Sequence, residues 1–265
     1  MKWVSRAASA LAAVLLWAAF PVSAQEVEGY LAPAELPSIT AWLPAPPAEG
    51  SPAEKADIDR FLATRPLLTR PEGARAHLDM AYAATAVAPR FAETLGVSLD
   101  AHNAPTFMRL MARVTTDIED VVAPIKISRA QGGRVRPFVR YPDQPTCTPL
   151  YPGIEDTGSY PSTHAALGWL WGAILAELAP DLTDRLLARG LQYGESRVIC
   201  GFHYDSDIAA GRLAAAALLV RLHADPEFRA DLNRARAEIE AARGRRKPAF
   251  RWRLPKLSNP LAEHR

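Results

Sequence analysis

The order of hydrophobic and polar residues along the chain predicts a protein built from helices. Apolar residues recur near every 3.6 positions in residues 53–68, 74–96 and 106–130, which is the period of an amphipathic helix. Residues 98–105 read as a loop, and Pro124 is expected to break or kink the third stretch. No stretch shows the clear alternation of a β-strand, and no segment is repeated. The pattern therefore predicts an all-α fold.

The second half of the chain predicts a buried helix covered by amphipathic ones. A long apolar run starts near Ser162 and ends where Pro180 breaks it. Helical patterns follow over residues 181–197 and 201–225, and an amphipathic pattern covers residues 226–244. Because an apolar helix has to be buried by its neighbours, this order predicts a single-domain helical bundle with buried central helices.

Residues 1–24 have the three parts of a secretory signal peptide. A basic start is followed by an apolar stretch over residues 7–20 and by small residues that end at Ala24. An uncleaved membrane anchor is the alternative, but the apolar stretch is short for a span, which favours cleavage. No other apolar run is long enough to cross a bilayer. We therefore expect a periplasmic or secreted protein with no integral membrane segment after processing.

The two ends of the remaining chain differ in composition from its centre. Residues 25–55 are rich in proline and alanine and predict an extended arm on the surface of a domain that covers residues 25–242. Residues 243–265 contain eight Lys or Arg residues and one acidic residue, which predicts a mobile basic tail. Such a tail suits an anionic surface, but it is more often simply solvated, and we expect no nucleic-acid partner. Whether the protein forms a homo-oligomer is left open by the sequence.

Cys147 and Cys200 are the two cysteines of the chain. An even number of cysteines in an exported protein favours a disulfide. Two separate thiols are the alternative, and the bridge between Cys147 and Cys200 is the preferred interpretation.

Candidate chemistry starts with a histidine and an aspartate in the segment of residues 196–207. His203 and Asp207 are four positions apart in a helical pattern, so we expect them to share one face of a helix. A carboxylate there can fix one ring nitrogen of the histidine and leave the other free to attack an electrophile. Arg197 precedes the pair by six positions. By itself such a pair is more often a surface contact than a catalytic group.

The sequence Pro-Ser-Thr-His at residues 161–164 comes just before the long apolar run. Ser162 lies where a helix N-cap is expected, and backbone N–H groups at a helix start form an anion site. His164 then lies in the first turn, where it can act as a general acid. A capped helix with a buried histidine is the simpler reading of this stretch alone.

A third segment supplies arginines in a glycine-containing loop. Arg129, Arg134 and Arg136 follow the helix that Pro124 is expected to interrupt. Guanidinium groups bind phosphate oxygens through a two-pronged hydrogen-bond arrangement. The three segments together suit phosphoryl transfer through a covalent histidine. No set of residues has the spacing of metal ligands, so we expect no metal and no cofactor.

The order and spacing of these segments resemble the bacterial class A non-specific acid phosphatases. Those enzymes belong to the superfamily of type-2 phosphatidic acid phosphatases and vanadium haloperoxidases, whose pattern is K-x6-RP, then PSGH, then SR-x5-H-x3-D. The third block is met in full over residues 196–207. The resemblance also includes the proline-rich start and the last helical segment, and it leaves out the basic tail. It implies the helical fold of this superfamily and a metal-independent hydrolase of phosphomonoesters such as nucleotides or sugar phosphates.

The resemblance also implies a role for each matching residue. His203 would be the nucleophile that forms phosphohistidine, and Asp207 would orient it. His164 would protonate the leaving oxygen and later activate water. The residues that would hold the phosphate are Arg136, Ser162 and Arg197. Arg129 and Thr163, at the two positions that depart from the pattern, would belong to the same site.

Two positions depart from the family pattern. Arg129 stands where the family has lysine, and Lys126 is three residues out of register. Thr163 stands where the family has glycine, and its bulk makes a close approach of the backbone to phosphate harder. Thr163 keeps its backbone N–H and adds a hydroxyl donor, and Arg129 keeps the positive charge. We therefore expect activity to survive, with phosphotransfer as a side activity.

Other functions stay open at this point. A lipid phosphatase at a membrane surface would use the basic tail as its tether, although the chain has no further spanning segment. A phosphate- or nucleotide-binding protein with impaired turnover would retain the anion site but not the chemistry, and the presence of both histidines and Asp207 argues against it. A vanadium haloperoxidase fits less well, because the flanking sequence resembles the class A enzymes.

Overall fold

The computed structural model describes residues 27–244. The signal peptide expected over residues 1–24 lies outside the described residues. So does the tail expected over residues 243–265, apart from its first two residues, which end the last helix. No helix within the described part of the chain has both the length and the apolar character needed to cross a bilayer.

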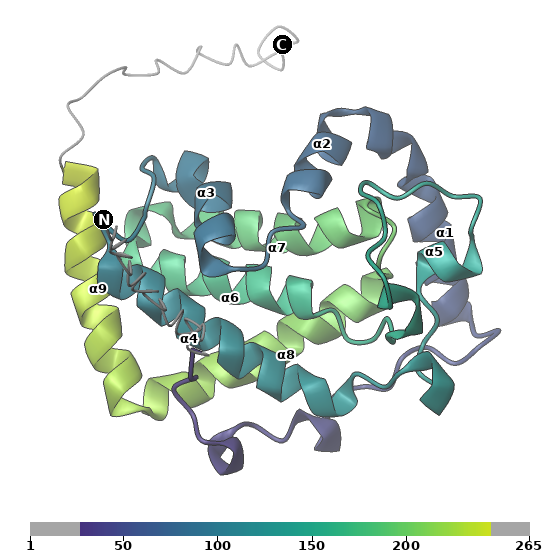
Figure 1. Cartoon of the computed structure of the whole chain (residues 1–265), viewed down its shortest axis with the longest axis horizontal. Helices are drawn as coiled ribbons and strands as arrows, with labels where there is room; N and C mark the ends of the chain where they lie inside the picture. Colours follow the sequence, from purple (N-terminus) through teal and green to yellow (C-terminus); the bar gives the residue numbers. More distant parts are fainter. Residues whose placement is uncertain (1–26, 245–265) are drawn as a thin grey trace, which may run out of the picture.

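Helices build the described part of the chain, and no strand occurs within residues 27–244, which confirms the predicted all-α class (Figure 1). The α-helices are α1 (Pro52–Ala63), α2 (Pro71–Leu78), α3 (Ala84–Leu95), α4 (Pro105–Val122), α5 (Pro137–Arg140), α6 (Thr163–Leu178), α7 (Thr183–Ile199), α8 (Asp205–Ala224) and α9 (Pro226–Gly244).

Helix α6 lies at the centre of the bundle, as the apolar run predicted. It packs along α7 and α8, while α4 and α9 cross the same core and α3 covers it from outside (Figure 1). Trp171 of α6 is fully buried between Phe91 of α3 and Phe107 of α4, with ring centroids 5.9 and 5.7 Å away. A helix that is apolar on all sides is stable only when other helices cover it. The central position of α6 follows from that requirement.

Close approach of α8 to the start of α6 depends on Gly211. A Cβ atom at Gly211 would lie 2.3 Å from the carbonyl oxygen of Ser162, which is closer than side chains tolerate. The backbone of Ser162 is also tied to the start of α8, because its N–H donates to the carbonyl of Asp207 over 3.0 Å. These contacts fix the first turn of α6 against the first turn of α8.

One helical stretch of the prediction is divided in the structure. The pattern over residues 74–96 gives two helices, α2 and α3, with an irregular connection over residues 79–83. Asp79 at the end of α2 is buried and accepts hydrogen bonds from Arg189 and from the Ser196 hydroxyl at 2.7 Å. Because this carboxylate is anchored to α7, the chain leaves the helix there and turns toward the centre of the molecule.

The proline-rich segment before α1 carries only two short 3-10 helices over residues 27–51. The buried Asp117 of α4 holds its start, because the carboxylate accepts from the backbone N–H groups of Tyr30 and Leu31 at 3.0 and 3.1 Å. Tyr30 also donates from its hydroxyl to Asp231 of α9 at 2.8 Å.

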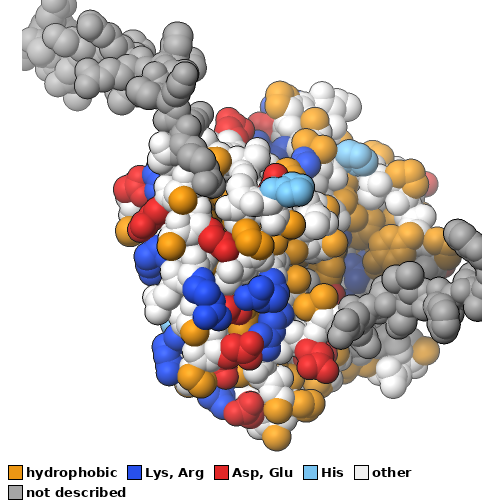
Figure 2. Space-filling model, turned by 60° about the vertical axis from the view of Figure 1, so that its left-hand side comes forward, with side chains coloured by type: hydrophobic (Ala, Val, Ile, Leu, Met, Phe, Trp, Pro, Cys, Tyr) orange, Lys and Arg blue, Asp and Glu red, His pale blue; other side chains and the backbone are white. Residues whose placement is uncertain are grey.

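Figure 2 shows basic and acidic side chains mixed on the face that α9 forms.

The predicted disulfide between Cys147 and Cys200 is present in the structure, with the two Cα atoms 4.6 Å apart. It joins the long loop before α6 to the end of α7. The backbone N–H of Cys147 also donates to the carbonyl of Cys200 over 3.2 Å. The bridge therefore holds the loop beside the segment that carries Arg197 and His203.

Candidate active site

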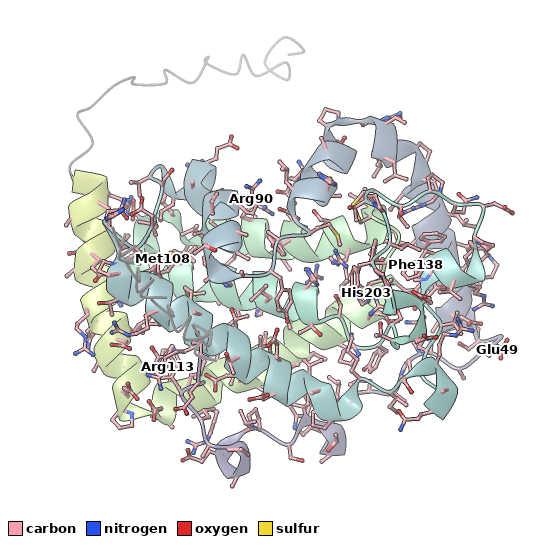
Figure 3. All side chains as sticks on the ribbon, in the orientation of Figure 1. Glu49, Arg90, Met108, Arg113, Phe138 and His203 are labelled. Carbon is pink, nitrogen blue, oxygen red and sulfur yellow. A yellow bond between two sulfur atoms is a disulfide. The ribbon has the colours of Figure 1, made fainter. Side chains whose placement is uncertain are left out.

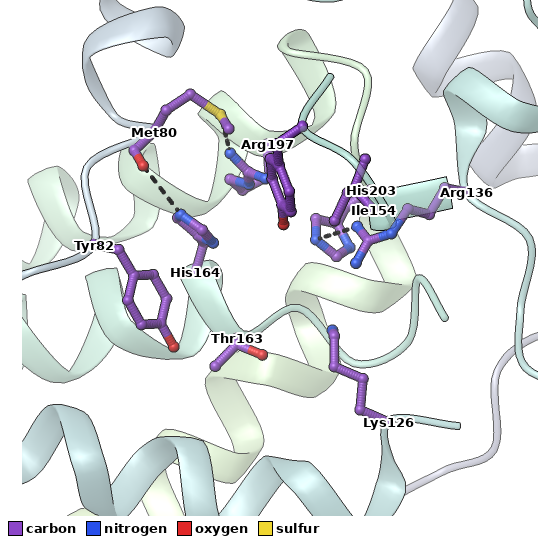
Figure 4. Close-up of a pocket in the computed structure, with 10 residues that line it drawn as sticks. Met80, Tyr82, Lys126, Arg136, Ile154, Thr163, His164, Arg197 and His203 are labelled. Carbon is purple, nitrogen blue, oxygen red and sulfur yellow. Dashed lines mark hydrogen bonds between the residues drawn. The ribbon is translucent and has the colours of Figure 1, made fainter. Parts of the chain in front are cut away.

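The structure brings the three sequence segments together around one cavity of about 460 Å³. The cavity lies in the half of the molecule that holds His203 and Phe138, away from Met108 (Figure 3). Three cations and two histidines line it together with aromatic and apolar side chains (Figure 4). The lining residues are Met80, Tyr82, Lys126, Arg136, Tyr151, Ile154, Thr163, His164, Arg197 and His203.

His203 lies in the turn between α7 and α8, not on a helix as the pattern predicted. Gly201 has a φ of 86°, a left-handed conformation that glycine adopts at low cost, and it reverses the chain after α7. Helix α8 then begins at Asp205, so Asp207 lies in its first turn and reaches back toward the turn. The prediction that His203 and Asp207 share a helix face was wrong, because His203 lies before the start of α8. The two side chains nevertheless meet, with His203 Nδ1 3.5 Å from Asp207 Oδ2.

The neighbours of His203 define which ring nitrogen carries the proton. Nε2 lies 3.2 Å from Nη1 of Arg136, and a guanidinium can only donate, so Nε2 is the acceptor. Nδ1 faces Asp207 and also the Ser159 hydroxyl at 3.4 Å, so Nδ1 carries the hydrogen. The ring is almost fully buried. The lone pair of Nε2 therefore points to the side of the ring where Arg136 lines the cavity.

Asp207 is held in place by groups that do not line the cavity. Its Oδ2 accepts from the Ser159 hydroxyl at 2.6 Å and from the backbone N–H of Tyr204 at 2.9 Å. Its Oδ1 accepts from Arg134 at 2.6 Å, and the same guanidinium donates to Asp57 of α1 at 2.6 Å. Arg134 was a candidate for phosphate contact, and the structure places it instead between two buried carboxylates.

His164 lies in the first turn of α6, half-buried at the cavity wall. Its Nε2 is 3.3 Å from the carbonyl oxygen of Met80, which can only accept, so Nε2 carries the hydrogen. Nδ1 is then the atom of His164 that can gain and give a proton. The ring also makes an edge contact with Tyr82, with centroids 4.8 Å apart.

Ser162 is the N-cap of α6, as predicted, and its hydroxyl accepts from the backbone N–H of Ala165 at 3.3 Å. Ser162 is fully buried and does not line the cavity, whereas Thr163 does. The hydroxyl of Ser162 thus caps the start of α6, and Thr163 and His164 are the residues of this helix that face the cavity.

Lys126, not Arg129, supplies the cation from the segment after α4. The chain turns at Pro124, and Lys126 follows with its Nζ 2.7 Å from the carbonyl oxygen of Pro161. Arg129 is exposed, lies outside the cavity and reaches only the carbonyl of Glu155 at 3.5 Å. The expectation that Arg129 occupies the lysine position of the family was therefore wrong. Lys126 occupies the cavity position instead.

Arg136 and Arg197, both candidates from the sequence, complete the cationic side of the cavity. Both are buried, and Arg136 also donates to the hydroxyl of Thr157 at 2.9 Å. Arg197 contacts the sulfur of Met80, and its Nε is buried without a hydrogen-bond partner among the described residues. A buried donor that lacks a partner is costly unless a ligand accepts from it. An anion in the cavity would accept from this donor.

The electrostatics of the cavity favour neutral histidines. Burial lowers the pKa of His203 well below 6.5, and the charges of Arg136 and Lys126 lower it further. Burial and Arg197 lower the pKa of His164 in the same direction. Burial and Arg136 also lower the pKa of Lys126, to about 7. Each shift has the same main cause, because burial disfavours the protonated, charged form, and the neighbouring cations add to this effect.

Several lining residues carry no sequence signal. Met80 and Tyr82 come from the irregular connection after α2, and Tyr151 and Ile154 come from the long loop before α6. None of the four belongs to a motif. The division of residues 74–96 into two helices, which puts Met80 and Tyr82 at the cavity, depends on the contacts of Asp79 and is not visible in the hydrophobic period.

Comparison with known proteins identifies the family. Residues 122–230 match the PAP2 superfamily and contain every lining residue of the cavity except Met80 and Tyr82. An acid phosphatase of Zymomonas mobilis subsp. mobilis is 38% identical over 206 residues, which cover 76% of this chain and 75% of the relative. A non-specific acid phosphatase of Providencia stuartii is 34% identical over 199 residues, covering 75% and 79% of the two chains.

A third relative extends the match over more of the chain. A non-specific acid phosphatase of Salmonella typhimurium is 30% identical over 218 residues, covering 82% of this chain and 86% of the relative. The chain therefore belongs to the bacterial non-specific acid phosphatases of the PAP2 superfamily and is a phosphoric monoester hydrolase.

Proposed function

We propose that this acid phosphatase hydrolyses small phosphomonoesters through a phosphohistidine at His203 and needs no metal ion. One observation carries the proposal: Nδ1 of His203 faces Asp207, so the Nε2 lone pair, which accepts from Arg136 in the free enzyme, lies on the side of the cavity with its three cations. A neutral imidazole fixed in one tautomer by a carboxylate is an effective nucleophile. Nucleotides and sugar phosphates are the proposed substrates, and phosphotransfer to an alcohol is a side reaction of the same intermediate.

The first step transfers the phosphoryl group to the enzyme. Nε2 of His203 forms a bond to phosphorus while the bond from phosphorus to the ester oxygen breaks. Nδ1 of His164 gives its proton to the departing oxygen, so an alcohol leaves and His164 becomes neutral. The imidazole of His203 is then cationic in the phosphorylated form, and Asp207 stabilises that charge across Nδ1.

The second step returns the enzyme to its starting state. Neutral His164 accepts a proton from water at Nδ1, and the water oxygen bonds to phosphorus as the bond to Nε2 of His203 breaks. Inorganic phosphate leaves, His203 is neutral again, and His164 holds the proton for the next cycle. When an alcohol takes the place of water, the same step makes a new phosphomonoester.

The cations are proposed to hold the equatorial oxygens of the phosphoryl group in both steps. Lys126, Arg136 and Arg197 line the cavity, and the backbone N–H of Thr163 lies at the start of α6, where the helix dipole favours an anion. Preorganised donors of this kind are the largest source of rate enhancement in many enzymes. Together they supply the positive charge for which other phosphatases use metal ions.

The lowered pKa of His164 in the free protein has a consequence for its role as an acid. A phosphate group in the cavity brings negative charge among the three cations and raises the pKa of His164. A phosphomonoester loses its second proton near pH 6, so at mildly acidic pH the substrate itself brings the proton that His164 needs. This arrangement supports turnover at acidic rather than alkaline pH.

The dependence of kcat/KM on pH tests this proposal. His203 must be neutral to attack, and its pKa lies well below 6.5, so attack is lost only as pH falls through that lowered pKa. We expect an acid limb below pH 6.5 and an alkaline limb that follows the second ionisation of the substrate, measured at constant ionic strength. An acid limb at the ordinary histidine pKa would contradict the assigned state of His203.

The cellular location of the protein is a proposal as well, and so is the alternative of a lipid phosphatase. We propose an exported protein, because the disulfide between Cys147 and Cys200 suits an oxidising compartment. A lipid phosphatase tethered by the basic tail has no support among the described residues, since the tail lies almost entirely outside them.

A further inference from the structure

One wall of the cavity differs in chemistry from the rest. The side that holds His203, Arg136 and Lys126 is cationic, whereas His164 is bordered by Met80 and Tyr82 (Figure 4). The Tyr82 ring makes an edge contact with the His164 ring at 4.8 Å between centroids, and the carbonyl of Met80 lies 3.3 Å from His164 Nε2. The aromatic neighbour of His164 is therefore Tyr82, while the Met80 sulfur lies between this side of the cavity and Arg197, which it contacts.

The position of this wall determines what it meets during the reaction. His164 gives its proton to the ester oxygen, so that oxygen lies beside His164 when the bond to phosphorus breaks. The carbon attached to that oxygen then lies on the side of the cavity away from His203, where Tyr82 and Met80 are. We infer that Tyr82, with Met80, forms a leaving-group subsite that favours phosphomonoesters with an aromatic leaving group; this rests on the proposed role of His164.

Tyr82 is held firmly enough to act as a binding surface. The carbonyl of its neighbour Ala81 accepts from the Tyr193 hydroxyl at 2.5 Å, and Asp79 is anchored to Arg189 and Ser196 of α7. Burial, with the nearby Glu119 carboxylate, raises the pKa of the Tyr82 hydroxyl, so the ring stays neutral. A side chain held in place before the ligand arrives loses little entropy on binding.

The rest of the cavity leaves room for a ring beside Tyr82. Its volume of about 460 Å³ is far larger than a phosphoryl group needs, and ligand pockets of this size take whole small molecules. Tyr151, whose side chain is 54% exposed, and the buried Ile154 line the same cavity. A phenyl ring bound to the ester oxygen can thus contact aromatic and apolar side chains, while a polyol such as glycerol gains little there.

The test compares two substrates across variants of Tyr82. Phenyl phosphate and glycerol 2-phosphate are each assayed with the wild type, Tyr82→Phe, Tyr82→Leu and Tyr82→Ala. Each substrate is compared with itself, so the intrinsic reactivity of its leaving group cancels. We expect kcat/KM for phenyl phosphate to fall about tenfold in Tyr82→Ala and several-fold in Tyr82→Leu, because an aromatic contact contributes about that factor. Glycerol 2-phosphate should change less than twofold, and Tyr82→Phe should behave as wild type.

Controls separate this inference from the proposed mechanism. Val220→Ala changes a side chain that is 75% exposed on α8 and should alter neither substrate. Equal losses for both substrates in Tyr82→Ala and Tyr82→Leu, or no loss for either, would overturn the subsite, since Tyr82 would then act only by supporting His164 or not at all. Failure of the mechanism is seen differently: His203→Ala would still turn over both substrates.

Discussion

Replacing Lys126 by methionine is expected to lower kcat/KM for phenyl phosphate by about a hundredfold or more, the usual cost of one preorganised donor at a reacting anion. Replacing Arg129 by methionine is expected to change it less than threefold. Lys126 lines the cavity with its Nζ 2.7 Å from the carbonyl of Pro161, whereas Arg129 is exposed outside it. Steady-state kinetics of both variants, with inhibition by inorganic phosphate as a measure of anion binding, checks the difference.

The comparison also tests the alignment of the motif with the fold. The family spacing assigns the lysine position to Arg129, and the fold assigns it to Lys126. A large loss in Arg129→Met with little change in Lys126→Met would show that the motif spacing is right and that the path of the chain after Pro124 differs from the one described.

The charge of Lys126 also depends on pH in a way that suits an acid phosphatase. Its pKa is lowered to about 7 by burial and by Arg136. Lys126 is therefore cationic below about pH 7 and loses its charge as pH rises through that value. Phosphate binding in the free enzyme should weaken over the same range, which reinforces the preference for acidic conditions. Lys126→Arg should keep the charge to higher pH.

Replacing Arg134 by methionine is expected to lower the free energy of unfolding by about 3–5 kcal/mol, since it leaves two buried carboxylates without their cation. The guanidinium lies 2.6 Å from both Asp57 and Asp207, and the three side chains are at most 9% exposed. Urea unfolding at neutral pH measures the loss. The matched control is Lys55→Met, which breaks an exposed pair with Asp59 and should cost at most about 0.5 kcal/mol.

Arg134 should affect catalysis as well as stability, as a positioning residue for Asp207. At a temperature where Arg134→Met is fully folded, kcat should fall and the acid limb of the pH profile should move, because the carboxylate that faces His203 is no longer fixed. Arg134→Lys keeps a cation and should restore part of kcat. Loss of stability with an unchanged kcat and pH profile would limit Arg134 to a structural role.

Local signals in the sequence predicted the parts of the fold that depend on neighbouring residues. The N-cap at Ser162, the apolar run after it and the amphipathic segment over residues 226–244 appear in the structure where the pattern placed them. The disulfide between Cys147 and Cys200 was expected from the even number of cysteines and is present. Each of these depends on residue types within a few positions or on a simple count.

The parts that the sequence did not predict depend on contacts between distant residues. Asp79 ends α2 because Arg189 and Ser196 hold it, and no local pattern records that contact. Lys126 enters the cavity because the chain turns at Pro124, which the motif spacing does not take into account. The contact between His203 and Asp207 was expected from their spacing, but it forms between a turn and a helix start.

The central claim is that His203 carries the phosphoryl group, and trapping the intermediate tests it most directly. His164→Gln removes the base for the second step, and 4-nitrophenyl phosphate needs no acid for the first, so this variant should accumulate phosphoenzyme. Peptide mass spectrometry after an alkaline quench, which preserves phosphohistidine, should place one phosphoryl group on His203, with none in the double variant that also carries His203→Ala. Label on another residue, or full turnover by His203→Ala, would contradict the account.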